Sequence, residues 1–382
     1  ATLNGFLVST GAAPTEVYCF YGTNDAGPAI SGWPRSAYLG FCPAGQASTG
    51  VSGLDSETTY YYRSYATNAS GVAWASSASS FRTLLNGADY LYRMKISFPG
   101  YTRTEPLTNF PALVLLGTNR TGFAYRQFQS TTGGDLRFTD AGWTRLLNHE
   151  IERWDTASNS CVWVQVPLLS SSNDYIWAYW GSPTRTNAPS YTTNGATWSS
   201  EYGLVEHMAQ SAGSAVADST ANSRTGTIVA TSYAWQAAGA IGKALRLNGN
   251  ANDVIELGAR PASLAGDYTI SSWFKTLQPN TTYRTLARGS TANGDHMIIL
   301  QTGTDNLGFW GNAAGGSFAD STYDLTTPAS EWHWLAITAT NGASRFYADG
   351  AYVGMVSKKS SLDVFAVGNI QSVYGGQKWS EY

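Results

Sequence analysis

The sequence predicts an all-β protein made of β-sandwich domains in series. Aromatic residues make up 13% of the chain, with 14 Trp and 23 Tyr, while charged residues make up only 13%. This composition is typical of strands joined by small polar turns. Several runs, such as residues 162–166 and 175–180, alternate two kinds of side chain with the period of two that a strand requires. At 382 residues the chain is also too long for one ordinary domain.

Charge and hydropathy exclude two kinds of interaction. The net charge is −3 and the chain has no basic cluster, which argues against a nucleic-acid partner. No uninterrupted apolar run is long enough to span a membrane. The sparse charge and abundant aromatic, Gly, Ser and Thr residues are typical of an extracellular or cell-surface protein, and we expect that location.

Residues 1–84 form the first predicted module, with alternating strands near residues 2–8 and 59–66. A turn containing Gly53 and Leu54 leads into the tyrosine-rich strand that begins near Tyr60. These residues resemble the E–F corner of fibronectin type III domains, in which a leucine loop precedes a packed tyrosine. The resemblance implies a sandwich of the immunoglobulin and fibronectin kind, although the strand that usually comes first in such domains is absent before the strand at residues 2–8.

Residues 90–185 form the middle predicted module, after a short linker. Its motifs are YLYRMKISFPG, NFPALVLLG, GGDLRFTD, LLNHEIERWD, VWVQVP and IWAYWG. As a set, they resemble a bacterial domain family of unknown function that occurs in large secreted proteins just ahead of laminin-G-like domains. The resemblance implies a β-sandwich and no particular reaction.

Residues 198–382 form the third predicted module. Its signals are the strands DYTISSW at 267–273, WHWLAIT at 332–338 and RFYADG at 345–350. Asp349-Gly350 lies between two apolar strands and predicts a tight hairpin. These motifs resemble the concanavalin A-like, laminin-G-type jelly roll, which implies two packed antiparallel sheets. One more strand usually follows the Gly-Asn pair that stands here at residues 368–369.

The densest group of ionisable residues is HEIERWD, residues 149–155. Glu150 and Glu152 are two residues apart, so on a strand both carboxylates lie on one face, as a glycoside hydrolase would need. The alternative, which we favour, is that they face solvent or pair with Arg137, Arg145 or Arg153. His207 follows Glu206 and is interpreted as a structural histidine. No known catalytic motif is present, so we expect no catalytic residues.

The third module contains candidates for a metal and for a glycan. Asn250, Asn252 and Asp253 cluster in one loop, and oxygen ligands of this kind suit calcium, the one cofactor we consider. Asp295 and Asp320 lie in other loops and are further candidates. Exposed aromatic rings can stack on sugars, and the candidates near loops are Trp310 and Tyr323, with Trp235 in a polar stretch. Core packing is the alternative for each ring.

Cysteines and sequons give modification candidates. Cys19 and Cys42 lie close enough in sequence to form a disulfide within the first module, with two buried thiols as the alternative. Cys161 is expected to be a buried thiol. Asn68, Asn119 and Asn280 begin Asn-x-Ser/Thr sequons and are acceptors if the source glycosylates its extracellular proteins.

The sequence favours a non-catalytic structural or adhesive protein outside the cell. We expect the first and last modules each to lack one strand and therefore to have unpaired sheet edges, which a second copy could complete to give head-to-tail filaments. The alternative that the residues leave open is a glycan-binding segment of a secreted polysaccharide-processing protein. A glycoside hydrolase is the weaker third hypothesis. The expected partners are therefore copies of the same chain, carbohydrate, or both.

Overall fold

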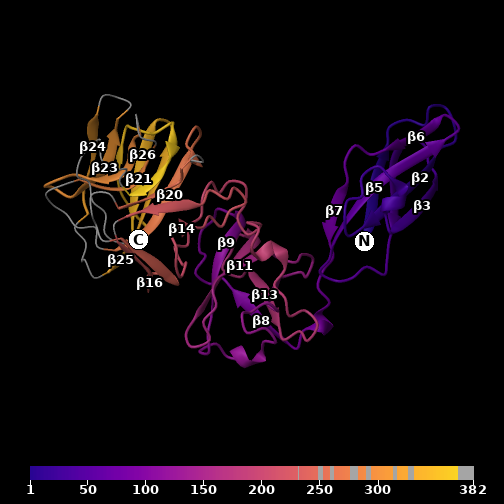
Figure 1. The fold of residues 1–382 in the computed structure, drawn as a ribbon, viewed down its shortest axis with the longest axis horizontal. Coiled ribbons are helices and arrows are strands. Elements are labelled where there is room, and N and C mark those ends of the chain that lie inside the picture. Colours follow the sequence, from indigo (N-terminus) through magenta and orange to yellow (C-terminus); the bar gives the residue numbers. More distant parts are fainter. Residues whose placement is uncertain are drawn as a thin grey trace. The chain divides into compact units, whose positions relative to one another are not determined.

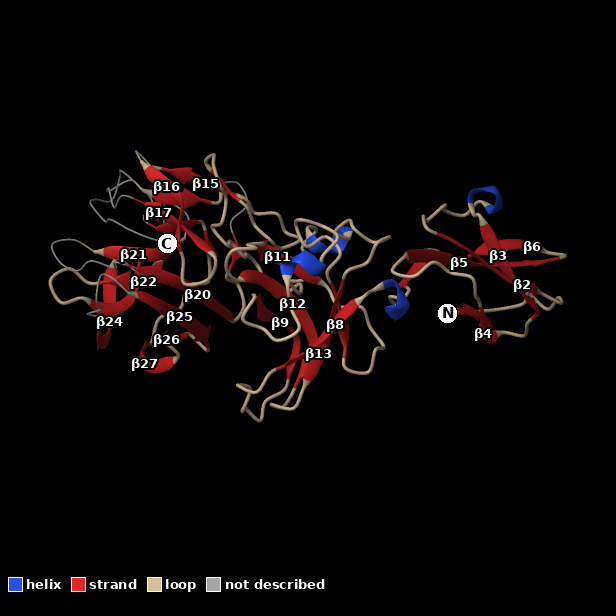
Figure 2. Cartoon of the chain, turned by 90° about the horizontal axis from the view of Figure 1, so that it is seen from below, coloured by secondary structure: helices blue, strands red, loops and turns tan. Residues whose placement is uncertain are grey.

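The computed structural model describes residues 1–230, 232–247, 253–258, 262–275, 283–289, 294–312, 316–325 and 331–368. Strands dominate, and the only helical segments in these ranges are four short 3₁₀ turns (Figure 2). The prediction of an all-β protein is therefore confirmed. The turns are η1 (Ile30–Gly32), η2 (Gly87–Asp89), η3 (Tyr125–Gln127) and η4 (Ser190–Thr192). No helix among the described residues has the length and apolarity that crossing a membrane requires.

The chain divides into two compact units. Figure 1 labels many of their strands on a ribbon coloured along the sequence. Unit 1 consists of residues 1–108, 126–147 and 166–188, and unit 2 of residues 109–125, 148–165 and 189–382. The three module boundaries drawn from the sequence stay a prediction.

Unit 1 begins with a β-sandwich. One of its sheets is the pair β1–β4, and the other has the strand order β3-β2-β5-β6, with β7 also paired to β5. Alternate residues of these strands point inward, and Leu3, Cys19 and Tyr60 meet in the core. The Tyr60 hydroxyl contacts both the backbone nitrogen and the carboxylate of Asp55. This is the tyrosine corner that the resemblance to fibronectin domains implies. The strands are β1 (Thr2–Leu7), β2 (Glu16–Gly22), β3 (Arg35–Phe41), β4 (Gly45–Gly50), β5 (Thr59–Asn68), β6 (Gly71–Trp74) and β7 (Ser79–Arg82).

The predicted disulfide between Cys19 and Cys42 is wrong, because both thiols are free. Cys19 pairs across the β2–β3 ladder with Ala37, whereas Cys42 lies five residues further along the chain. Five residues of extended chain span roughly 16 Å, and a disulfide needs Cα atoms less than about 7 Å apart. Cys19 instead lies 3.7 Å from the Ser64 hydroxyl, and its burial raises the pKa of the thiol.

A third sheet of unit 1 has the order β10-β13-β8, with β8 at Tyr92–Ser97, β10 at Arg137–Asp140 and β13 at Tyr175–Trp180. The residues on one face, including Phe138, Ile176 and Ala178, are almost completely buried. The opposite face carries Trp177 and Tyr179, as the alternation in the sequence predicts.

Unit 2 contains most of a sheet in the order β11-β12-β9, with β9 at Leu107–Leu116, β11 at His149–Arg153 and β12 at Ser160–Leu169. It also contains the jelly roll, in which an eight-stranded sheet, β14-β15-β18-β29-β21-β22-β23-β24, and a four-stranded sheet, β20-β25-β26-β27, share one core. Leu245, Phe309, Phe274 and Phe346 belong to this core. The predicted hairpin at Asp349-Gly350 joins β26 to β27, and both residues have the positive φ that a tight hairpin turn of this kind requires.

The remaining strands of unit 2 have short pairings, β16 with β17 and β19 with β28. Strand bounds in the jelly-roll region are β14 (Ala215–Val216), β15 (Gly226–Val229), β16 (Tyr233–Ala238), β17 (Lys243–Leu247), β18 (Val254–Glu256), β19 (Ala262–Ser263), β20 (Tyr268–Lys275), β21 (Arg284–Arg288), β22 (His296–Leu300), β23 (Asn306–Gly311), β24 (Ser317–Asp324), β25 (Trp332–Thr340), β26 (Ala343–Ala348), β27 (Ala351–Val356), β28 (Asp363–Val364) and β29 (Ala366–Gly368).

Candidate functional site

A buried ion cluster in unit 2 gathers two glutamates around one histidine. Glu150 and Glu152 lie on β11, two residues apart and therefore on one face of the strand. His207 Nδ1 lies 3.2 Å from Glu152 Oε2, and His207 Nε2 lies 3.6 Å from Glu150 Oε1. The first contact is a hydrogen-bonded ion pair, while the second is too long for a hydrogen bond and is an electrostatic contact.

Two indoles and a hydroxyl complete this cluster. Trp163 Nε1 donates to Glu152 Oε2 and Trp198 Nε1 donates to Glu150 Oε2, each at 2.7 Å. Ser219 donates its hydroxyl to Glu150 Oε1 at 2.6 Å. The imidazole of His207 is stacked on Trp163, with ring centroids 5.9 Å apart, and also contacts Trp198. The two carboxylates are therefore held by donors from four other side chains.

The surroundings set the charge of each group in the cluster. Burial disfavours the imidazolium, but the contacts with Glu150 and Glu152 outweigh it and raise the pKa of His207 to about 9. Burial also acts against the charge of Glu150, yet the opposing contacts with His207, Ser219 and Trp198 lower the pKa of that carboxyl. His207 is consequently a cation at neutral pH, and the glutamates are its counter-ions.

The neighbouring Glu206 has the opposite electrostatic environment. Burial, followed by the nearby charge of Asp218, raises the pKa of its carboxyl to about 8. Glu206 is therefore protonated at neutral pH and is not a counter-ion of His207.

The partners of the glutamates differ from the arginines expected from the sequence. Arg137 forms its ion pair with Glu57, and Arg153 pairs with Asp155. The counter-ion of Glu150 and Glu152 comes from His207, more than 50 residues along the chain. The expectation that His207 is structural agrees with these contacts.

A cavity of about 270 Å³ adjoins this cluster, and indole rings dominate its wall. Trp163 connects the two sites, since its nitrogen binds Glu152 and its ring lines the cavity. The other tryptophans in the wall come from the four-stranded sheet of the jelly roll, and polar groups lie among them. The lining includes Trp163, Trp273, Trp332, Trp334, Glu152, His207, Lys243 and Ser271.

The strand register explains why the jelly roll presents three tryptophans together. Trp273 on β20 pairs directly with Trp334 on β25, and the pair Lys275 and Trp332 is the next but one along the ladder. Paired residues point to the same face, so these rings share the face opposite to the buried Phe274. Trp273 remains 40% exposed, and the Trp332 nitrogen is fixed by a 3.1 Å hydrogen bond to a backbone carbonyl. The sheet therefore holds an ordered aromatic surface.

The glycan candidates chosen from the sequence lie elsewhere. Trp310 donates its Nε1 to Asn312 at 2.8 Å and its ring packs against Tyr283. Tyr323 is half-buried against the jelly-roll core, and so is Trp235. None of the three lines the cavity. A usable signal was present in the sequence, because Trp332 and Trp334 are two residues apart on one strand and must share a face.

The calcium candidates are only partly described. Asn250 and Asn252 lie outside the described residues, whereas Asp253 is 1% exposed. The Asp320 carboxylate accepts hydrogen bonds from the Asn306 side chain and the Thr322 backbone. Within the described parts of the chain, no three His, Cys, Asp or Glu residues are grouped to hold a metal ion. The calcium loop stays a prediction.

The glycosylation candidates have different environments. The Asn68 amide donates to the Thr10 carbonyl and to the Thr15 hydroxyl, so it is engaged within unit 1. Asn119 is exposed, and Asn280 lies outside the described residues. Glycosylation at these positions stays a prediction.

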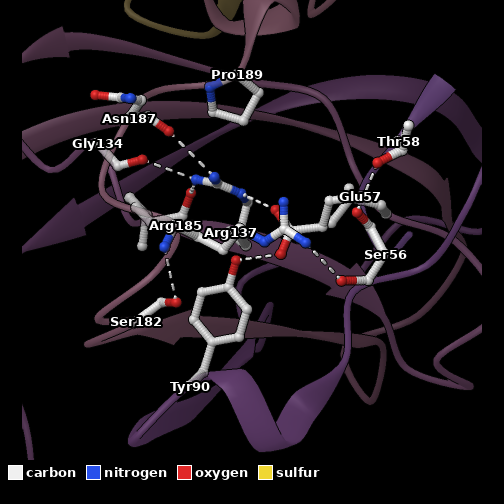
Figure 3. A network of polar contacts seen from close by, with 12 residues as sticks. Ser56, Glu57, Thr58, Tyr90, Gly134, Arg137, Ser182, Arg185, Asn187 and Pro189 are labelled. Carbon is white, nitrogen blue, oxygen red and sulfur yellow. Dashed lines mark hydrogen bonds and ion pairs between the residues drawn. The ribbon is translucent and has the colours of Figure 1, made fainter. Parts of the chain in front are cut away.

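Unit 1 has its own buried ion pair, shown in Figure 3. Arg137 Nε lies 2.5 Å from Glu57 Oε2, and their side chains are only 3% and 5% exposed. The other carboxylate oxygen of Glu57 accepts a hydrogen bond from the Tyr90 hydroxyl. Arg137 also donates to the carbonyls of Gly134 and Asn187. The network thus ties the turn before β5 to the loops around β10 and after β13 (Figure 3).

Two family models match parts of the chain. Residues 248–382 match the concanavalin A-like lectin/glucanases superfamily, and residues 132–199 match a domain of unknown function. No curated protein is similar enough to count as a match.

Several solved structures show limited similarity. Domain 4 of AbnA, a GH43 extracellular arabinanase from Geobacillus stearothermophilus solved with arabinotriose, is 24% identical over 41% of this chain and 78% of its own, with a TM-score of 0.32. The carbohydrate-binding module CBM66 from Bacillus subtilis is 21% identical over 37% and 92%, with a TM-score of 0.25. Trypanosoma rangeli sialidase with sialic acid is 11% identical over 86% and 57%, with a TM-score of 0.34. At these TM-scores the similarities carry no weight for function. The two family matches, by contrast, confirm the jelly-roll family and the domain that precedes it, as predicted from the sequence.

Proposed function

We propose that this chain is an extracellular, non-catalytic carbohydrate-binding protein whose glycan occupies the tryptophan-lined cavity of unit 2. The observation that carries the proposal is the set of four indoles around one open cavity, three of them aligned on one sheet face. The matched superfamily supports a carbohydrate ligand, since its description names lectins and glucanases.

The chemistry of the wall suits a sugar. The C–H faces of a pyranose ring are apolar and stack on flat aromatic rings, while the hydroxyls at its edge need hydrogen-bonding groups. The ammonium of Lys243 and the hydroxyl of Ser271 lie in the same wall as the indoles. A cavity of about 270 Å³ has room for one or two sugar rings.

The contacts of the two glutamates favour binding without catalysis. A hydrolytic pair needs one carboxyl to hold a proton and both to reach the substrate. Here the pKa of Glu150 is lowered and its oxygens are occupied by Trp198, Ser219 and His207. We therefore assign Glu150 and Glu152 to fixing the position of His207 and Trp163.

Glycan-array screening of the whole chain, followed by calorimetric titration of each hit, tests the proposal. Trp273→Ala should weaken binding about tenfold or more, because it removes one stacking surface. Tyr38→Ala is a matched control, since that residue is 53% exposed, lies in unit 1 and does not line the tryptophan-lined cavity. Retention of full affinity in Trp273→Ala, or no glycan bound by the native chain, would refute the proposal. Titration with and without a chelator tests the calcium loop in the same experiment.

Two other expectations from the sequence have separate tests. Hydrolysis of a bound glycan by the native chain but not by Glu150→Gln and Glu152→Gln would establish the glycosidase hypothesis. Head-to-tail filaments stay a prediction, which negative-stain microscopy of concentrated protein checks.

A further inference from the structure

A second aromatic surface lies on unit 1, over the sheet β10-β13-β8. Tyr175, Trp177 and Tyr179 alternate along β13 and point to the same face, opposite to Ile176 and Ala178. Tyr175 and Trp177 are half-buried, whereas Tyr179 is buried and stacked on Trp143. The register places Arg93 opposite Tyr179 and Lys95 opposite Trp177. Rings and cations therefore alternate across two neighbouring strands.

The two cations of this face lie over aromatic rings instead of being neutralised by acids. The Arg93 guanidinium is 5.1 Å from the centroid of the Trp177 ring, and the Lys95 ammonium is 4.0 Å from that of Tyr175. Neither forms an ion pair with any residue that the structure describes. Stacking on a ring fixes a guanidinium while leaving its N–H groups free for an anion.

A cavity of about 450 Å³ opens beside these residues. Arg93 is the one charged side chain in its wall, so the wall has a positive charge and no negative one. The lining consists of Asn86, Gly87, Ala88, Tyr90, Leu91, Tyr92, Arg93, Trp143, Trp177 and Tyr179.

Trp143 is held in this wall by a strained turn. Its φ is 58°, a conformation that bulky residues rarely adopt, and Asp140 fixes the turn by accepting from the backbone of Thr144 and Arg145. The indole is stacked on Tyr179, with centroids 6.2 Å apart and planes at 21°. A Cβ at Gly87 would lie 2.8 Å from the same ring, so only glycine leaves room for it there. The ring is thus fixed in place while 42% exposed.

We propose that this surface binds an acidic oligosaccharide, one that contains uronic acid residues. Trp143 and Trp177 would each take the apolar face of a sugar ring, and Arg93 would take the carboxylate through its paired N–H groups. A cavity of about 450 Å³ has room for two to three rings.

An acidic peptide fits the arrangement less well. Extended peptides usually bind by pairing with the exposed edge of a sheet through backbone hydrogen bonds. This cavity is lined instead by side chains of the sheet face, among them Trp177 and Tyr179 from β13 and the guanidinium of Arg93 from β8. The site also lies in a different unit from the tryptophan-lined cavity, so either proposal can fail without the other.

Calorimetric titration of the full chain with an oligogalacturonate and with its fully methyl-esterified form tests the inference. The two probes have the same rings and differ in charge. We expect the acidic form to bind about tenfold or more tightly, with an affinity that falls as salt rises. Arg93→Gln should abolish this preference, and Arg93→Lys should restore it only in part, because lysine lacks the planar fork.

Trp143→Ala should weaken both probes, whereas Tyr38→Ala is the matched control and should leave both unchanged, because Tyr38 is 53% exposed and lines neither cavity. Thermal unfolding of each variant checks folding, and the surface residue Arg93 keeps the test available if Trp143→Ala does not fold. Equal affinity for the two probes, or unchanged binding in Arg93→Gln, would overturn the inference. Binding of poly-glutamate as tightly as oligogalacturonate, and independently of Trp143, would assign the site to peptides and also overturn it.

Discussion

Replacing His207 by Asn should destabilise unit 2 in a way that depends on pH. His207 has an ordinary pKa of 6.5, raised to about 9 between Glu150 and Glu152. A histidine with a raised pKa in the folded state contributes its full stabilisation below pH about 6.5, and loses it as the pH rises through about 9. At about 1.4 kcal/mol per pKa unit, the shift corresponds to roughly 3 kcal/mol at pH 6. The variant leaves two buried carboxylates without their cation, which is the loss of this same interaction and is not added to the figure.

Urea unfolding followed by tryptophan fluorescence measures this effect, since Trp163 and Trp198 contact the imidazole. In the native chain, the stability of this region should fall by about 2 kcal/mol between pH 7 and 9.5 from His207 alone. His207→Asn should be less stable at pH 6 by about 3 kcal/mol and should lose that part of the pH dependence.

Two further variants isolate the contribution of His207. Glu206 has its pKa raised from 4.5 to about 8, so its protonated form favours the fold at low pH, and this contribution disappears as the pH rises from 4.5 through 8. Glu206→Gln removes the contribution of Glu206, and the stability of this variant should still decline above pH 8 because His207 loses its proton there. His333→Asn is a matched control, because the Asp349 carboxylate that His333 contacts is 53% exposed and the pair should contribute less than about 1 kcal/mol. A profile of His207→Asn parallel to that of the native chain from pH 7 to 9.5 would contradict the reasoning.

Three other outcomes follow from unit 1. Glu57→Gln leaves the buried Arg137 without its counter-charge and should lower the free energy of unfolding, measured with urea, by about 3 kcal/mol. The same change at the exposed Glu105 should have almost no effect. Tyr60→Phe removes the hydroxyl of the tyrosine corner and should lower the stability of the first sandwich by about 1 kcal/mol in the same assay, and an unchanged midpoint would contradict that role. Thiol titration should find Cys42 reactive in the folded chain and Cys19 reactive only after unfolding. A reductant should leave the melting temperature unchanged. Detection of a Cys19–Cys42 disulfide by mass spectrometry would contradict the free thiols of the structure.

Local patterns were enough to predict much of the fold. The alternation along residues 175–180 identified β13 and its two faces, because side chains of a strand must alternate. The Asp349-Gly350 pair identified a hairpin because few other residues tolerate two successive positive φ angles. The same parity correctly placed Glu150 and Glu152 on one face. Each of these features depends on residues that are neighbours in sequence.

Features that depend on distant pairing could not be predicted. The spacing of Cys19 and Cys42 gives no information on the register between β2 and β3, and the register is what separates the thiols. The sequence predicts arginines as partners of the glutamates, whereas the fold brings His207 to them from a distant segment. The glycan candidate Trp310 was chosen for its nearness to a loop, but exposure of a ring depends on which sheet face the core covers.

The tryptophan-lined cavity is not a property of the jelly-roll family alone. Trp273 and Trp334 belong to residues 248–382, which match the superfamily, whereas Trp163 and His207 do not. Trp163 is fixed through Glu152, and Glu152 in turn is a counter-ion of His207. Loss of the His207 charge at high pH should therefore loosen one wall of the cavity while the sheet face with Trp273 stays intact. Glycan affinity should then weaken as the pH rises through about 9, and His207→Asn should show that weakened affinity already at pH 7. A sugar that binds the sheet face without contacting Trp163 would show no such pH dependence. The pH profile of glycan affinity therefore distinguishes a site formed by the sheet face alone from one that also includes Trp163.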